Sequence, residues 1–252
     1  MKKPSCGAVT GFVLSSMLSA ALVSVAQDFR VETDVFVANQ QQPVAEYLTL
    51  FHGQVVYDYR LTPPQEVVVL DLARNRFILL NISHRIKTEL TTHDVELFHQ
   101  RVRERMNGRD ATYFQAQFTH QYDAETHTHK LDSEKWSYQA VGSVPKNPDY
   151  VQRYRVFADW SVQLAAMRPG SFPPYGRLEL NRLLAEHGEV PESVERTVTI
   201  ARVFPPRRET LRTTHLYNWL LSEQDHRRIR RTGDDMAAFT PVSPEKYFQP
   251  IP

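Results

Sequence analysis

Three histidines fall within ten residues of this chain, at His120, His127 and His129. His127 and His129 are two positions apart, so a strand would place both imidazoles on one face, and a hairpin would bring His120 opposite them. With Asp123 or Glu125 nearby, such a group could hold zinc or copper. Threonine, aspartate, glutamate and histidine are also typical of a solvated hairpin tip. We therefore expect a surface hairpin that binds no metal tightly.

A second group of functional side chains is basic and lies near the C-terminus, at Arg227, Arg228, Arg230 and Arg231. Guanidinium groups pair well with phosphates and carboxylates, so these residues are candidate contacts for an anionic lipid headgroup, an acidic partner or a polyanion. The alternative is the solvated face of a terminal helix, with Ile229 as its one apolar anchor.

Two aromatic residues, Phe157 and Trp160, are the candidate apolar contacts for a ligand. Both lie within an expected helix over residues 149–167, beside its apolar stripe. Large aromatic side chains are also common in protein cores, and the sequence leaves both roles open.

The motifs of the common nucleotide-binding and hydrolase families are absent. Of the glycines beyond residue 26, Gly170 and Gly176 are the most closely spaced, and two prolines without N–H donors lie between them. This spacing excludes a phosphate-cradling loop. No serine has nucleophile-elbow spacing, and no helix carries two histidines around a glutamate. We expect a non-catalytic protein without a cofactor, although an enzyme without a local motif is compatible with these absences.

Residues 1–26 have the pattern of an export signal. Lys2 and Lys3 supply a positive start, a weakly apolar stretch follows, and residues 24–26 (SVA) form a cleavage site before Gln27. The stretch is short and interrupted by serines, which disfavours a membrane span. An uncleaved N-terminal anchor is the alternative. We expect a protein exported to the periplasm or beyond the cell, with no transmembrane segment in the mature chain.

Removal of this signal changes the composition in two ways. The only cysteine, Cys6, would be lost, which excludes disulfides and thiol chemistry. Loss of Lys2 and Lys3 would leave 28 Lys and Arg against 29 Asp and Glu. A nearly neutral chain offers no electrostatic case for nucleic-acid binding.

The first half of the remaining chain predicts a sheet. Apolar residues alternate with polar ones from Phe29 to Val37, the pattern of a strand with one buried face. Similar runs cover residues 44–51, 55–59, 66–70 and 77–82. Turns recur about every ten residues, which leaves no room for crossover helices, so we expect an antiparallel meander.

Helical spacing appears after Leu90. Helices are expected over residues 91–106, 149–167 and 175–186 and after Ser222, with further strands over 112–122, 135–141, 194–204 and 209–220. The fold class is therefore α+β: a curved antiparallel sheet, or open half-barrel, covered by two to four helices. Residues 27–240 form one expected domain, with a candidate hinge at 168–174 and a proline-rich extended tail at 241–252.

Four strand segments carry a family resemblance, namely residues 29–32 (FRVE), 55–59 (VVYDY), 67–71 (VVVLD) and 76–80 (RFILL). Behind an export signal, their order over residues 29–87 resembles the open half-barrel of periplasmic lipoprotein carriers of the Lol type and related exported proteins. The resemblance implies an apolar cavity under a concave sheet.

Three functions follow from these observations. The first is an exported, non-catalytic binding or carrier protein that holds an apolar or lipid-like ligand, or a lipoprotein, in the half-barrel. The second is a structural or interaction protein of the cell envelope that uses the Arg-rich C-terminal region to contact a protein partner. The third is a metal-dependent hydrolase centred on His120, His127 and His129.

Overall fold

The predicted alternation of apolar residues gives one twelve-stranded sheet in the computed structural model, which describes residues 27–105, 116–200 and 207–249. The strand order is β12-β6-β5-β4-β3-β2-β1-β11-β10-β9-β8-β7. All neighbours pair antiparallel except β12 and β6. The strands are β1 (Phe29–Val37), β2 (Ala45–His52), β3 (Val55–Arg60), β4 (Glu66–Asp71), β5 (Arg76–Asn81), β6 (Ile86–Thr91), β7 (Thr119–Asp123), β8 (Thr128–Asp132), β9 (Trp136–Ser143), β10 (Val190–Ile200), β11 (Arg207–Asn218) and β12 (Thr240–Pro241).

The described helices join this sheet into the α+β class that the sequence predicts. They are η1 (Leu72–Arg74), α1 (Thr92–Arg105), α3 (Asp149–Ala165), α4 (Tyr175–Glu186), α5 (Glu223–Ala238) and α6 (Pro244–Phe248). Among the described residues, no helix has the length and apolar character needed to cross a membrane.

Several sequence predictions concern residues that the structure does not describe. These are the signal peptide at 1–26 with Cys6, the last residue of the helix expected over 91–106, the start of the strand expected from residue 112, the end of the strand expected over 194–204, and residues 250–252 of the expected tail. They stay predictions.

The predicted meander is confirmed from β1 to β5 and continues into β6. Gly53 adopts a φ of +57° in the β2–β3 turn, a conformation that glycine reaches without steric cost. The sequence reading missed β6, in which Thr88 and Leu90 are buried while Glu89 between them is exposed. β11 pairs with the outer side of β1, which joins the two halves of the chain into one sheet.

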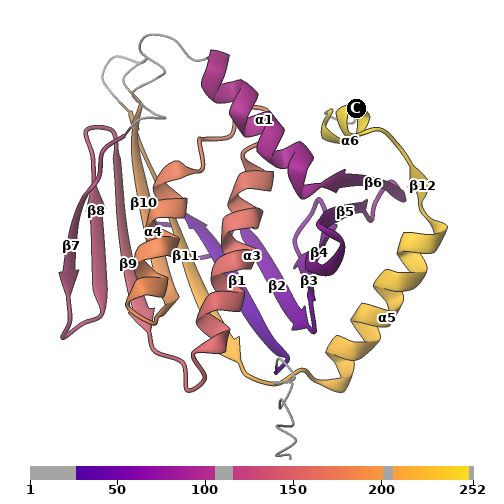
Figure 1. Cartoon of the computed structure of the whole chain (residues 1–252), viewed down its shortest axis with the longest axis horizontal. Coiled ribbons are helices and arrows are strands. Elements are labelled where there is room, and N and C mark those ends of the chain that lie inside the picture. Colours follow the sequence, from indigo (N-terminus) through magenta and orange to yellow (C-terminus); the bar gives the residue numbers. More distant parts are fainter. Residues whose placement is uncertain (1–26, 106–115, 201–206, 250–252) are drawn as a thin grey trace, which may run out of the picture.

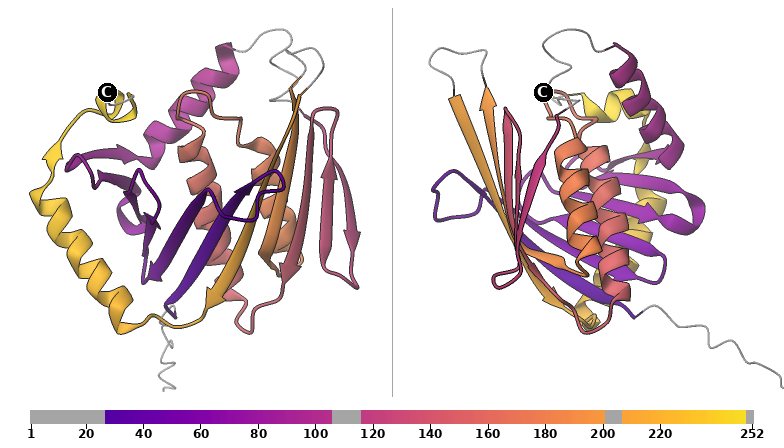
Figure 2. Two further views of the ribbon diagram at one scale, coloured as in Figure 1. Left: turned by 180° about the vertical axis from the view of Figure 1, so that it is seen from behind. Right: turned by 60° about the vertical axis from the view of Figure 1, so that its left-hand side comes forward.

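Helices α3 and α4 lie side by side on one face of the sheet, which bends around them (Figures 1 and 2). Helix α3, which falls within the expected 149–167 helix, packs on the meander. Tyr150, Val151 and Tyr154 from α3 share a buried cluster with Phe29 and Phe51 from β1 and β2. α4 packs its leucines against β8, β9 and β10 on the same face.

Helix α5 covers part of the opposite face, over β2 to β5. Tyr59 and Leu80 from the sheet lie in one apolar cluster with Ile229 and Met236 from α5. Ser222 caps this helix as predicted, because its hydroxyl accepts a hydrogen bond from the Asp225 backbone N–H. β2 to β5 are therefore buried on both faces, as the middle layer of three.

The prediction of an extended tail over residues 241–252 is wrong for residues 244–248. These residues form α6, which begins after Ser243, whose hydroxyl accepts from the Lys246 N–H. The ring of Tyr247 is buried and its hydroxyl donates to Glu66 at 2.7 Å. Burial of an aromatic ring is favourable, so α6 docks against the sheet edge near β6.

Candidate functional site

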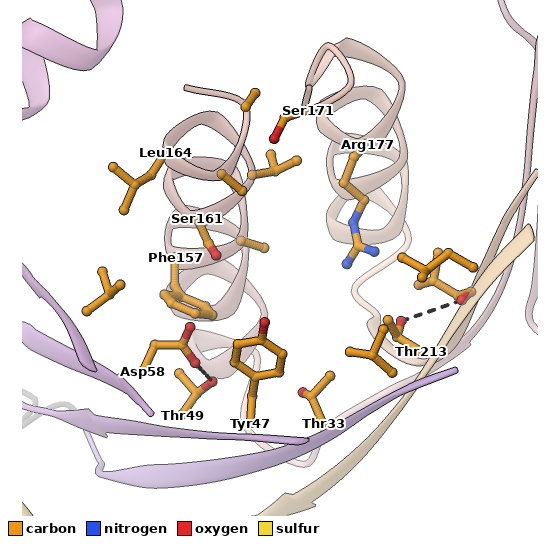
Figure 3. Close-up of a pocket in the computed structure, with 18 of the residues that line it drawn as sticks. Thr33, Tyr47, Thr49, Asp58, Phe157, Ser161, Leu164, Ser171, Arg177 and Thr213 are labelled. Carbon is orange, nitrogen blue, oxygen red and sulfur yellow. Dashed lines mark hydrogen bonds between the residues drawn. The ribbon is translucent and has the colours of Figure 1, made fainter. Parts of the chain in front are cut away.

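A cavity of about 480 Å³ lies between the concave face of the sheet and helices α3 and α4 (Figure 3). Its apolar lining comes mainly from α3 and from the central strands. Pockets of about 300 to 1,000 Å³ are typical of small-molecule sites. The lining includes Val35, Val68, Leu70, Phe77, Phe157, Val162, Leu164, Val194 and Leu211.

Asp58 is a carboxylate on this largely apolar surface. The alternation of β3 places it on the same face as Val56, which belongs to the core cluster beneath α3. Burial raises the pKa of Asp58 to about 6, against the opposing effect of the hydrogen bond that the Thr49 hydroxyl donates at 2.8 Å. Asp58 therefore titrates close to neutral pH, within the cavity wall.

Arg177 lies in the first turn of α4, and its side chain points into the cavity (Figure 3). Its Nε donates to the Asn181 side-chain oxygen at 2.8 Å, and Asn181 in turn donates to Asp159 at 2.8 Å. This relay orients the guanidinium. Arg177 forms no ion pair with any residue of the described chain.

Arg196 of β10 is a second cation in the lining. Its guanidinium lies 5.1 Å from the centre of the Phe172 ring, and its Nε is buried without a hydrogen-bond partner among the described residues. Burial lowers the pKa of Arg196, with a smaller contribution from the charge of Arg177, although Tyr138 acts in the opposite direction. The guanidinium groups of Arg177 and Arg196 both carry a positive charge.

His215 adds a neutral polar group to the same wall. Burial lowers its pKa to about 3, and the charge of Arg177 contributes in the same direction. Its two ring nitrogens lie 3.0 Å from the hydroxyls of Thr33 and Thr213. These hydrogen bonds hold the imidazole ring in place.

The loop between α3 and α4 borders the cavity with Arg168, Ser171, Phe172 and Pro173. Arg168 pairs with Glu66 of β4, so one charge of this border is neutralised. The segment 168–174 that the sequence marks as a candidate hinge is thus part of the cavity wall. Its role as a hinge stays a prediction.

The two aromatic candidates from the sequence have different positions. Phe157 lines the cavity (Figure 3). Trp160 is absent from the lining and packs edge-on against Phe77, with ring centroids 6.0 Å apart. Trp160 is a core contact of α3, whereas Phe157 is available to a ligand.

The arginine candidates lie on α5, on the other side of the sheet from α3 and α4 (Figure 2). Arg227, Arg230 and Arg231 are exposed, and Arg228 is half-buried. The structure gives these four no ion pair with described residues. They form a separate basic surface that does not contribute to the cavity.

The structure brings His120, His127 and His129 together around Glu189. The hairpin is confirmed, since β7 and β8 pair with Tyr122 opposite His129. A surface location is wrong for His129, whose side chain is fully buried. Its Nε2 lies 2.8 Å from one Glu189 oxygen and its Nδ1 lies 3.2 Å from His120 Nε2, while His127 Nδ1 lies 2.6 Å from the other oxygen.

Local backbone geometry places Glu189 in this cluster. Gly188 ends α4 with a φ of +73°, and the Glu189 N–H then donates to the Leu184 carbonyl at 2.9 Å. A Cβ on Gly142 would lie only 2.1 Å from a Glu189 oxygen, so the carboxylate fills the space above that glycine. The buried partner of the histidines thus comes from a helix end far along the chain, a position that sequence spacing does not reveal.

The cluster is a hydrogen-bonded network around one charge. Burial alone would raise the pKa of Glu189, but hydrogen bonds from His127, His129 and Tyr122 outweigh burial and lower it. Burial lowers the pKa of His129, which favours a neutral imidazole beside the carboxylate. Within the described ranges, no three His, Cys, Asp or Glu side chains are arranged to hold a metal ion.

Sequence reasoning missed Asp58, Arg177 and Arg196 as site residues. For Arg196 and Asp58, the sequence contains a signal: a charge at an inward position of a strand. Arg196 stands between Val194 and Val198, which are both buried, so a charge occupies an inward position of the strand. Asp58 interrupts β3 in the same way. Arg177 lies on a helix, where no comparable alternation marks it.

No protein-family model matches this chain, and no curated protein is significantly similar to it. The candidate function therefore depends on the geometry of the chain's own residues.

Proposed function

We propose that this protein is an exported, non-catalytic carrier that holds an apolar or lipid-like ligand between its concave sheet and helices α3 and α4. The observation that carries the proposal is the cavity of about 480 Å³ with a mainly aliphatic and aromatic wall. An open apolar cavity leaves surface exposed that a well-packed core would bury, and a ligand would remove that surface from water. The resemblance to Lol-type carriers supports the same function.

Ser161 provides the sharpest test, because its small side chain points into the cavity from α3 (Figure 3). Ser161→Trp would fill part of the cavity with an indole ring. We expect this variant to bind the neutral apolar probe N-phenyl-1-naphthylamine at least tenfold more weakly than the wild type, which corresponds to about 1.4 kcal/mol. Probe fluorescence in an equilibrium titration measures the difference.

Gln152→Trp is the matched control, since Gln152 is exposed on the same helix and does not line the cavity. It should bind the probe as the wild type does. Thermal melts of both variants check that each is folded. A wild type that does not bind the probe, or a folded Ser161→Trp variant that binds it unchanged, would contradict the proposal.

Export is a separate part of the proposal and has its own test. Processing after Ala26 would give a mature protein that starts at Gln27. N-terminal sequencing of the protein from an envelope or culture fraction should return that residue. Recovery of residues 1–26 in a membrane fraction would favour the uncleaved anchor.

The exposed arginines of α5 favour a second candidate function, contact with an acidic envelope protein. Arg227, Arg230 and Arg231 are three and four positions apart, so they share one face of the helix. Replacement of all three by glutamine should release a co-purified partner and leave probe binding unchanged. Retention of the partner by this triple variant would contradict this candidate.

A further inference from the structure

The cavity wall carries more positive than negative charge. Of its charged side chains, Arg168 and Glu66 form an ion pair. Arg177 and Arg196 are left against Asp58, the one other carboxylate in the lining. Figure 3 shows Asp58 beside Thr49 on the sheet and Arg177 on α4, on different sides of the space that they border.

The two arginines line the same cavity, and burial, together with the charge of Arg177, lowers the pKa of Arg196. Both cations are half-buried in one largely apolar cavity; Tyr138 and Glu209 favour the charged form of Arg196, whereas Arg177 lies in the first turn of α4, where a positive side chain opposes the helix dipole. Within the part of the chain that the structure describes, the buried Nε of Arg196 has no hydrogen-bond partner. Buried donors in native proteins are nearly always satisfied, by protein, water or ligand.

An anionic group between the two guanidiniums would resolve these unfavourable features together. Arginine forks bind carboxylate and phosphate oxygens in bidentate geometry, with strong charge-assisted hydrogen bonds. The Asn181 relay already fixes the direction of Arg177, and the Phe172 ring lies over Arg196. Both cations are thus oriented before an anion arrives.

We propose that the ligand is a single-chain amphiphile whose anionic head, a carboxylate or a phosphate, binds between Arg177 and Arg196. This inference rests on the proposed carrier function. The hydrocarbon chain of the ligand lies along the apolar wall formed by Phe157, Leu164 and Phe77. The cavity is in the lower half of the usual range of pocket volumes, which fits one chain better than two.

Four ligands with a common chain or a common head test this inference. Hexadecanoate, hexadecyl phosphate, hexadecanol and inorganic phosphate are each titrated against bound N-phenyl-1-naphthylamine. We expect both anionic amphiphiles to bind about tenfold to hundredfold more tightly than hexadecanol, the range of one or two charge-assisted hydrogen bonds. Inorganic phosphate should not displace the probe, because it lacks the chain.

Arg177→Met should remove most of this preference and leave hexadecanol binding unchanged, while Arg177→Lys should retain part of it. Arg182→Met is the matched control on the same helix, since Arg182 pairs with Glu179 and Glu186 outside the cavity. It should keep the full preference. Unchanged hexadecanol binding also shows that each variant is folded.

The outcomes separate the inference from the proposed function. Equal binding of hexadecanol and hexadecanoate by the wild type, or an unchanged preference in Arg177→Met, would overturn the inference and leave the carrier function standing. Displacement of the probe by inorganic phosphate as readily as by hexadecyl phosphate would show that the ligand is a free anion and not an amphiphile. Failure of hexadecanoate, hexadecyl phosphate and hexadecanol all to bind would overturn both the inference and the carrier function.

Discussion

Asp58, Arg177 and Arg196 are charged residues that face inward, toward a cavity with a mainly apolar wall. An uncompensated charge in such a place lowers stability, because burial removes water without supplying an opposite charge. Charged groups with shifted pKa values in a concave site, as Asp58 and Arg196 are here, are typical of functional residues. At the scale of single residues, the cavity therefore differs from a simple gap in packing.

Asp58→Asn tests the buried carboxylate. Its pKa is about 6 in the folded protein, above the ordinary value of 3.8, so the folded state holds this proton more tightly than the unfolded state. Stability from this group is therefore full below pH 4 and is lost as pH rises through 6. The asparagine keeps an oxygen for Thr49 and has no such loss.

We expect the variant to match the wild type near pH 4 and to be more stable by about 2 to 3 kcal/mol at pH 7 to 8. Urea denaturation at five pH values measures this difference. Asp132→Asn, on the exposed side of β8, controls for the removal of one negative charge. A difference between Asp58→Asn and wild type that does not change with pH would refute the assignment.

Glu189→Gln tests the histidine network. The carboxylate accepts hydrogen bonds from Tyr122, His127 and His129, whereas the glutamine amide would place an N–H group against one of these donors. We expect a loss of about 2 to 4 kcal/mol in the free energy of unfolding. Glu186→Gln changes an exposed carboxylate at the end of α4, three residues before Glu189, and should cost less than about 0.5 kcal/mol. Equal effects of the two substitutions in urea denaturation would show that the network is not stabilising.

At the scale of helices and strands, local patterns predicted most of the elements. Apolar runs between regularly spaced turns marked β1 to β5, with clear alternation in β1, and helical spacing marked α3 because its apolar stripe is broad. α6 was missed, because four prolines in residues 241–252 indicate an extended chain, and the docking of Tyr247 depends on a distant partner, Glu66. Local signals predict an element, whereas its contacts come from the rest of the fold.

Helix α3 allows a direct comparison of a core ring with a cavity ring. Trp160 packs on Phe77, so Trp160→Ala should lower the free energy of unfolding by about 2 to 4 kcal/mol and leave probe affinity unchanged. Phe157 already borders open space, so Phe157→Ala should cost less stability and weaken probe binding. Chemical denaturation and probe titration of both variants measure the two effects. If Phe157→Ala alters stability alone, its ring belongs to the core and not to a ligand site.

At the scale of the whole molecule, the cavity depends on pairings between distant parts of the chain. β1 pairs with β11, which brings Thr33 next to His215 in the same wall. The volume between sheet and helices depends on the curvature of that sheet and on the packing of α3 and α4, which alternation and helical spacing do not encode (Figure 2). The antiparallel sheet and the helices of the α+β class could therefore be predicted from sequence, but the residues that face the cavity could not.

Photolabelling tests the carrier function most directly, because it reports both binding and place. Hexadecanoate with a diazirine in its chain is bound to the protein, irradiated and located by peptide mass analysis. We expect saturable labelling of peptides from α3, around Phe157 and Leu164, that unlabelled hexadecanoate competes away and that Ser161→Trp reduces at least tenfold, about 1.4 kcal/mol. Labelling confined to α5 or to the β7–β8 hairpin, or labelling of α3 that does not saturate, would contradict the account.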